Sequence, residues 1–360
     1  MRRPIPCSLC LAVLGCAAPA QPDAAGTDGG DDTDLPVPAT AHWMADVFAD
    51  HPEVPLGRVL LPGAFNSSSY ACEARLGISP HAPAVVRTLW GDETTPDDDP
   101  NRQRVVDWAR TQDRSLGRQL EDGIRFLEIN VTIKDGVITT WHSVYGLPLD
   151  EVLDELVAFA QAWPDEIVVL TFGLDLEEED LPQLVDLMAA PRDGTSVCSL
   201  LHDGEAPAAT VALGALQAAG RPLVWAPGGR LRELLLAREG CTPSTVTLDR
   251  TWSITTTPEG VDAALAGSVD SRDPDHLLVN DFAFSLDGSA SVVEQASFIG
   301  TYAGVREASL ALGFAGDLPS RLIAAHDGMA NLNVLAGAFY EDTDLVEAAI
   351  ARNRARWAGE

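Results

Sequence analysis

Residues 111–131 read TQDRSLGRQLEDGIRFLEINV, and this stretch decides the fold. Leu116 and Leu120 lie four residues apart, which places both side chains on one face of a helix, so we predict a helix over about 105–122. The apolar run at 124–131 that follows predicts a buried strand. A helix that leads directly into an apolar strand is typical of an α/β protein.

Strand and helix patterns alternate on both sides of this stretch. The run IVVLTF at 167–172 is continuously apolar, as expected for a strand buried on both faces of its sheet. The predicted strands are 56–61, 124–131, 137–142, 167–172, 222–226, 246–254, 277–284 and 332–335, and the predicted helices between and after them include 149–162, 231–238, 261–266, 291–312 and 344–357. Strands interleaved with helices in this way predict one distorted (β/α)8 TIM barrel.

The N-terminus carries an export signal. Arg2 and Arg3 precede a short apolar core at 9–14, which is too short to span a membrane and is typical of a signal peptide. The sequence Val13-Leu14-Gly15-Cys16 resembles a lipobox, in which the cysteine is lipidated after cleavage. We therefore predict a lipoprotein signal peptide at 1–16, a disordered Asp/Gly/Pro-rich tether at 17–40 and a single barrel domain at 41–360.

The composition narrows the possible partners. With 54 acidic and 24 basic side chains, the formal charge is −30. Such a field repels nucleic acid and anionic membrane surfaces, so the membrane contact that we predict is the lipid on Cys16, in the outer membrane or at the cell surface. The sequence does not indicate an oligomeric state.

Three cysteines remain in the body, Cys72, Cys198 and Cys241. Export permits a disulfide, and an odd number leaves one thiol over. We favour a bond between Cys198 and Cys241, because both lie in the loop-rich central part, with three unpaired thiols as the alternative.

Several segments together resemble the phosphatidylinositol-specific phospholipase C (PI-PLC) X-domain family, within the PLC-like phosphodiesterase superfamily. They are LPGAFNSSSY at 61–70, the stretch at 111–131, WHSVYGLPLDEVLDEL at 141–156, PDEIVVLTF at 164–172 and NLNVLAGAFYEDTDLVEAAIARN at 331–353. The resemblance extends from about residue 43 to 357 and is strongest at 111–172. It implies the barrel fold and, for an active member, phosphodiester cleavage of a phospholipid head group.

The same resemblance implies a set of site residues. In the family, one histidine acts as the general base and a second acts as the general acid, a division of labour that suits two imidazoles near neutral pH. The base falls on Phe65, which cannot accept a proton, whereas the acid falls on His142. Asn66, Glu128 and Asn130 fall where the calcium-dependent branch holds its metal, so calcium is a possible cofactor.

This metal set departs from the family's pattern. Glu128 is its one carboxylate, the arginine of the metal-independent branch is absent at Asn130, and a further acidic ligand falls near Gly173, with Asp175 close by. Glu128 and Asn130 are two residues apart, so on a strand both side chains point to the same side. A buried Glu128 needs a partner, for which a metal ion, water or Arg125 would serve.

Three functions follow as hypotheses. The first is a phospholipase C-like phosphoric diester hydrolase at the cell envelope, weakened because loss of the base costs about 10²- to 10⁴-fold. The second is a catalytically inactive barrel that binds a polyol, phospho-head group or glycan as a surface protein. A proton acceptor opposite His142 would favour the first, and a base from His326-Asp327 is one possible source. A glycosidase-like carboxylate pair is a weaker third hypothesis, because only Glu128 is well placed.

Overall fold

The computed structural model describes residues 36–251, 256–269, 273, 275–283, 297, 299–326 and 332–357. The chain divides into two units, 1–34 and 35–360, and all the features below belong to the second. The predicted signal peptide with its lipobox, most of the predicted tether, parts of the strands predicted at 246–254 and 277–284, much of the helix predicted at 291–312, and Asp327 lie outside the described residues. Within those ranges, no helix is long and apolar enough to cross a bilayer.

Nine strands of the described chain form one sheet. They are β1 (Leu61–Ala64), β2 (Phe126–Lys134), β3 (Val137–His142), β4 (Val144–Pro148), β5 (Val168–Asp175), β6 (Leu223–Val224), β7 (Thr247–Thr251), β8 (His276–Asp281) and β9 (Val334–Gly337). Parallel pairing runs in the order β6-β5-β2-β1-β9-β8-β7, and β3 and β4 form an antiparallel extension on the far end of β2. This is the sheet of the predicted distorted barrel.

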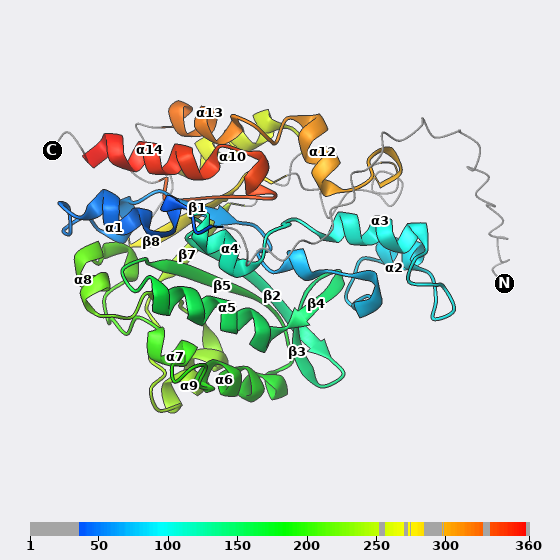
Figure 1. Ribbon diagram of the computed structural model, residues 1–360, viewed down its shortest axis with the longest axis horizontal. Coiled ribbons are helices and arrows are strands. Elements are labelled where there is room, and N and C mark those ends of the chain that lie inside the picture. Colours follow the sequence, from blue (N-terminus) through cyan, green and yellow to red (C-terminus); the bar gives the residue numbers. More distant parts are fainter. Residues whose placement is uncertain are drawn as a thin grey trace, which may run out of the picture. The chain divides into compact units, whose positions relative to one another are not determined.

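Helices pack around the sheet (Figure 1). They are α1 (Trp43–Phe48), α2 (Ala84–Trp90), α3 (Pro100–Ala109), α4 (Leu116–Glu121), α5 (Leu149–Ala162), α6 (Leu181–Ala189), α7 (Val197–Leu200), α8 (Leu213–Ala218), α9 (Gly229–Ala237), α10 (Pro258–Val269), α12 (Val305–Leu312), α13 (Leu318–Ala325) and α14 (Leu345–Trp357). Helix α5 has the predicted bounds, and its apolar face, which includes Val152, Leu153 and Leu156, is fully buried. Helices α4 and α5 lie side by side, as do α13 and α14.

Several predicted boundaries were wrong, among them the helix predicted over 291–312, which is interrupted at 302–304 before α12. Two of the differences have a local reason. The first strand, predicted at 56–61, is Leu61–Ala64 and includes Pro62 and Gly63, while 56–58 form a 3₁₀ turn. A Cβ atom at Gly63 would lie 3.0 Å from the side chains of both Phe126 and Ala336, so the close approach of β2 and β9 requires glycine there. The helix predicted over 105–122 is two helices, and Ser115 caps the second by accepting a hydrogen bond from the backbone of Arg118.

A buried ion pair fastens the N-terminal ends of β2 and β5. Arg125, just before β2, donates from Nε to Glu166 Oε2 at 2.8 Å, and both side chains are almost completely buried. Arg125 also donates to the carbonyl of Ala41, and Glu166 accepts from the backbone N–H groups of Met44 and Ala45 in α1. Arg125 therefore lies at the end of the barrel opposite to the strand C-termini. The suggestion that its guanidinium pairs with Glu128 was wrong.

We expect Glu166→Gln to lower the free energy of unfolding by about 3–5 kcal/mol, because it leaves the buried guanidinium of Arg125 without its counter-charge. Asp165→Asn is the matched control: this neighbouring side chain is exposed, and its change should stay within about 0.5 kcal/mol. Urea unfolding of both variants checks the prediction. A Glu166→Gln variant as stable as the control would contradict it.

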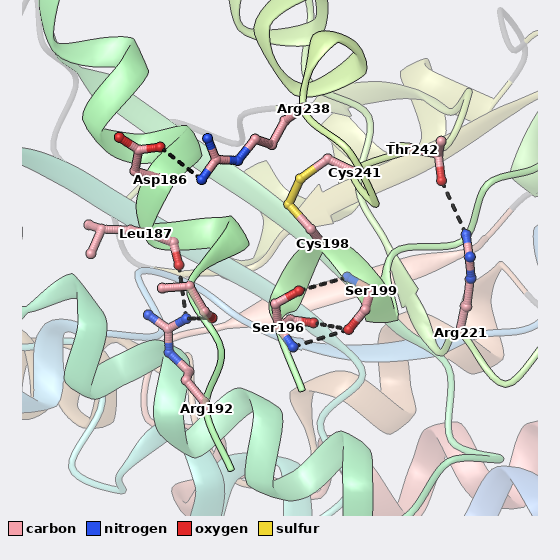
Figure 2. Close-up of a disulfide and its surroundings, with 11 residues drawn as sticks. Asp186, Leu187, Arg192, Ser196, Cys198, Ser199, Arg221, Arg238, Cys241 and Thr242 are labelled. Carbon is pink, nitrogen blue, oxygen red and sulfur yellow. Dashed lines mark hydrogen bonds and ion pairs between the residues drawn. A yellow bond between two sulfur atoms is a disulfide. The ribbon is translucent and has the colours of Figure 1, made fainter. Parts of the chain in front are cut away.

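The predicted disulfide is confirmed. Cys198 in α7 bonds to Cys241, 43 residues further along and beyond the end of α9 (Figure 2). In the chain-entropy model, closing a loop of this length stabilises the fold by about 4 kcal/mol. Cys72 is the free cysteine of the body, and burial raises the pKa of its thiol to about 12, so it is protonated and unreactive at neutral pH.

Candidate functional site

The candidate residues gather at the C-terminal ends of the parallel strands, where barrel enzymes place their sites. Phe65 and Asn66 follow β1, Glu128 lies in β2 and His142 ends β3. Asn66 has a φ of 46°, a left-handed conformation that asparagine tolerates better than most residues. This turn lets the backbone N–H of Asn66 donate to Glu128 Oε2 at 3.2 Å, so the loop after β1 is tied to β2 at the site.

The partner of Glu128 is an arginine that the sequence analysis missed. Arg250, in β7, donates from Nη1 to Glu128 Oε1 at 2.6 Å and from Nη2 to Glu128 Oε2 at 2.8 Å. The pair is bidentate, which is the strongest arrangement for a guanidinium and a carboxylate. Only 4% of Glu128 is exposed, so the arginine supplies the counter-charge that a buried carboxylate needs.

The same guanidinium binds a second buried carboxylate. Asp281, the last residue of β8, accepts from Arg250 Nε at 2.8 Å and from Nη2 at 3.1 Å. We call Glu128, Arg250 and Asp281 the arginine cluster. With both acids ionised, its formal charge is one negative, because two carboxylates share a single guanidinium.

Burial and shared charge shift the pKa values in this cluster. Burial raises the pKa of Asp281 to about 6; the charge and hydrogen bonds of Arg250 oppose the rise, and the charge of Glu128 adds to it. Burial lowers the pKa of Arg250, but its hydrogen bonds and charge interactions with the two carboxylates outweigh burial, so the net shift is upward. The guanidinium therefore stays charged, and Asp281 is the group that titrates near neutral pH.

The ring of Phe65 contacts both His142 and the arginine cluster. Its centroid lies 6.4 Å from that of the His142 ring in an edge-to-face arrangement, and the guanidinium carbon of Arg250 lies 5.7 Å from the Phe65 centroid. The place that the family resemblance gives to a general base is therefore held by an aromatic side chain packed between an imidazole and a cation. That ring can stabilise the cation through its π face but accepts no proton.

His142 is held through one ring nitrogen. Its Nδ1 lies 2.6 Å from the carbonyl oxygen of Ala109. Because a carbonyl only accepts, Nδ1 carries the hydrogen, and Nε2 is the nitrogen that can exchange a proton with a ligand. Burial lowers the pKa of His142, against the opposing effects of Ala109 and Glu128, so the ring is neutral at pH 7. A neutral imidazole presents an acceptor at Nε2, whereas the predicted general acid would need a proton there.

Asn130 fills the position where the resemblance implies an acidic ligand. Its Nδ2 donates to Asn66 Oδ1 at 2.5 Å. In the strand register Asn130 pairs with Gly173, and a Cβ atom at Gly173 would lie only 1.9 Å from Asn130 Oδ1. A larger residue at 173 is therefore incompatible with this position of Asn130. The carboxylate of Asp175, the acidic residue close to Gly173, lies 3.4 Å from His81 Nδ1 and accepts a hydrogen bond from Thr132 Oγ1.

The predicted calcium ligands come together, but their arrangement does not fit a divalent cation. Both oxygens of Glu128 face the guanidinium of Arg250, and the amide oxygen of Asn66 already accepts from Asn130. A calcium ion there would have one carboxylate and a neighbouring positive charge, which is a weak site for a hard cation. Over the ranges that the structure describes, no group of three or more His, Cys, Asp or Glu side chains is placed to hold a metal.

The proposed substitute base at His326 is not at the site. His326 Nε2 lies 2.8 Å from Asp262 Oδ1, which joins the end of α13 to α10 on the outside of the barrel.

The sequence contained one indication of Arg250 and Asp281: each is a charged residue inside a predicted strand, 246–254 and 277–284 respectively. That signal marks a possible inward-facing polar group but does not say which residue it pairs with.

We expect the stability of the protein to depend on Asp281 between about pH 4 and 6. The unfolded pKa of aspartate is about 3.9, so in this window the native state binds a proton that the unfolded state does not, and its stability rises as the pH falls. Relative to Asp281→Asn, the wild-type chain should gain about 2 kcal/mol between pH 7 and pH 4. Unfolding curves across this range check it, and a pH-independent difference would contradict it.

Comparison with known proteins gives a consistent family resemblance. No family model matches the chain. The chain is 30% identical over 151 residues to PI-PLC X domain-containing protein 1 of Danio rerio, a match that covers 41% of this chain and 47% of that protein. It is 29% identical over 137 residues to PI-PLC X domain-containing protein 2 of Mus musculus, a match that covers 37% of this chain and 38% of that protein. The chain thus spans less than half the length of these curated relatives.

Solved structures extend the likeness to most of the chain. A double mutant of the PI-PLC from Staphylococcus aureus superposes with a TM-score of 0.54 at 18% identity, covering 87% of this chain and 97% of that one. The PI-PLC from Listeria monocytogenes superposes with a TM-score of 0.53 at 15% identity, and the match covers 87% of this chain and 98% of that one. These comparisons confirm the resemblance to the PI-PLC X-domain-like, PLC-like phosphodiesterase superfamily, and the fold of this chain is the barrel of those phospholipases.

Proposed function

We propose that this protein is a PLC-like barrel that binds a polyol head group at the cell envelope and has lost efficient phosphodiester cleavage. The observation that carries the proposal is the packing of Phe65 between His142 and Arg250. Proton transfer from the attacking hydroxyl needs an acceptor at this place, and its loss typically slows such reactions by about 10²- to 10⁴-fold.

The charged groups that remain are also poorly arranged for cleavage. Phosphoryl transfer relies on positive charge that is available to the transition state. Here the guanidinium of Arg250 makes four hydrogen bonds to two carboxylates, which cancel its charge and occupy most of its donors. The neutral His142 is also in the wrong protonation state to donate to a leaving group at pH 7. Phospholipase C-like hydrolysis therefore has less support than binding.

The same groups suit a polyol. Carboxylates accept from hydroxyl groups, and the amides of Asn66 and Asn130 offer both donors and acceptors at the ends of neighbouring strands. The half-buried ring of Phe65 adds an apolar surface beside them. A few fixed polar groups next to an aromatic side chain are the usual composition of a small-molecule site.

Restoring the base tests the proposal. We expect the purified chain to cleave phosphatidylinositol barely above background, with calcium or with chelator, and Phe65→His to raise that rate by about 10²-fold, because the imidazole supplies the missing proton acceptor. The double variant Phe65→His, His142→Ala is the matched control and should lose that gain. Product release from phosphatidylinositol vesicles is the measurement.

Cleavage by the wild-type chain that disappears in His142→Ala would overturn the proposal and favour the hydrolase. A folded but inactive Phe65→His variant would contradict the prediction, because the missing base would then not be what limits cleavage. Head-group binding also requires that the wild-type chain binds myo-inositol, and calorimetry measures this.

The envelope location is part of the same proposal and is supported by the sequence motif at Cys16. Lipidation there would anchor the barrel through several acyl chains, which suffices for stable membrane attachment. We expect Cys16→Ser to move the protein from the membrane fraction to the soluble fraction and to abolish labelling by a fatty-acid probe. A variant that stays labelled and membrane-bound would contradict this anchor.

A further inference from the structure

We propose that the side-chain amides of Asn66 and Asn130, here called the amide pair, bind one hydroxyl group of the ligand, and that Gly173 positions this pair. The inference rests on the proposed head-group binding and adds which side chains recognise the polyol and by what chemistry. It follows from one hydrogen bond that the two amides make with each other and from a second one that they leave unmade.

Asn66 is held in place through its backbone. Its N–H donates to Glu128 Oε2 at 3.2 Å, and its carbonyl oxygen accepts from the N–H of Ser69 at 2.9 Å. The left-handed φ of 46° belongs to the same turn, and only 3% of the residue is exposed. The backbone at Asn66 is therefore fixed, which limits the directions that its amide can take.

The amide of Asn66 is only half used. Its Oδ1 accepts from Asn130 Nδ2 at 2.5 Å, whereas its Nδ2 is buried and has no hydrogen-bond partner among the residues that the structure describes. A buried N–H without a partner is costly, so we expect a ligand or a water molecule to complete it. Whatever completes Asn66 Nδ2 must be a hydrogen-bond acceptor.

Asn130 supplies the complementary group. Within the described part of the chain, the bond from its Nδ2 to Asn66 is the hydrogen bond that its side chain makes, so Asn130 Oδ1 is an open acceptor. A hydroxyl oxygen accepts one hydrogen bond and donates another, so a single hydroxyl satisfies both Asn66 Nδ2 and Asn130 Oδ1. An ionised phosphate or carboxylate oxygen only accepts, so it can use Asn66 Nδ2 but not Asn130 Oδ1. The amide pair is therefore best completed by a hydroxyl.

Gly173 makes this arrangement possible. In the register of β2 and β5, Asn130 pairs with Gly173, and a Cβ atom on Gly173 would lie 1.9 Å from Asn130 Oδ1 and 3.0 Å from its Cγ. The amide of Asn130 therefore occupies the space that a side chain at 173 would fill. Asn130 is half-buried, so a rotation of its side chain lets a hydroxyl reach the pair from solvent. Gly173 is thus a positioning residue that acts through Asn130.

A double-mutant cycle tests the role of Gly173. Binding of myo-inositol to the full-length chain is measured by calorimetry for the wild type, Gly173→Ala, Asn130→Ala and the double variant. We expect each single change to weaken binding about tenfold, and Gly173→Ala to have less than about a twofold effect once the Asn130 side chain is absent. Gly228→Ala, which places a Cβ atom in open space after β6, is the matched control and should bind as the wild type does.

Ligands that lack one hydroxyl test the donor of the amide pair. Asn66→Gly removes the amide and tolerates the φ of 46°. The probes are myo-inositol and its monodeoxy analogues, each of which lacks a different hydroxyl. We expect the loss of one particular hydroxyl to weaken binding about tenfold in the wild-type chain but less than about threefold in Asn66→Gly, because that hydroxyl no longer has its donor.

The outcomes separate this inference from the proposed function. If the wild-type chain binds myo-inositol but no hydroxyl is coupled to Asn66, or Gly173→Ala has the same effect with and without Asn130, the amide pair is not the hydroxyl site and head-group binding stands. If myo-inositol does not bind to the wild-type chain, head-group binding fails and this inference fails with it. The cycle and the ligand series use different variants, and circular dichroism shows which of them fold, so one experiment decides if a variant of the other is unfolded.

Discussion

The bridge formed by Arg250 joins three strands that are remote in sequence. Glu128 is 122 residues away and Asp281 is 31 residues away, yet both carboxylates bind the one guanidinium at short distances. Each of the three charges would be costly to bury alone, and removing Arg250 would take the shared counter-charge from both carboxylates. The conformations of β2, β7 and β8 at the site are thus linked through a single side chain.

The chemistry of the site follows from this bridge. A cation that holds two carboxylates has little charge left for a phosphate, and a carboxylate that already holds a guanidinium is a weak ligand for calcium. Phe65 adds to the same effect, since it packs on the cation and on His142 where a proton acceptor would be needed. The strand-end residues that the family resemblance assigns to a site are therefore present at the barrel end, with Phe65 in the place of the base and Glu128 paired with an arginine.

Stability and site lie at opposite ends of the strands. Arg125 and Glu166 form a buried pair before β2 and β5, and they fasten α1 through backbone hydrogen bonds. The disulfide between Cys198 and Cys241 adds a covalent tie between α7 and the segment after α9. Because neither feature uses the strand C-termini, a residue there such as Phe65 can determine the chemistry of the site without affecting what holds the barrel together.

The sequence by itself determined the features that depend on near neighbours: the alternation of strands and helices, the bounds of α5, the shared face of Glu128 and Asn130, and the absence of a proton acceptor at Phe65. It also indicated the disulfide. It placed β1 too early and joined α3 to α4, because the contact that requires Gly63 and the cap at Ser115 are not part of a hydrophobic period. Only the tertiary structure decided that Arg250 pairs with Glu128 and Asp281, and that Arg125 pairs with neither. The physical reason is that a charge pair across a barrel depends on how distant strands come together, and no local spacing in the chain encodes which cation will face which carboxylate.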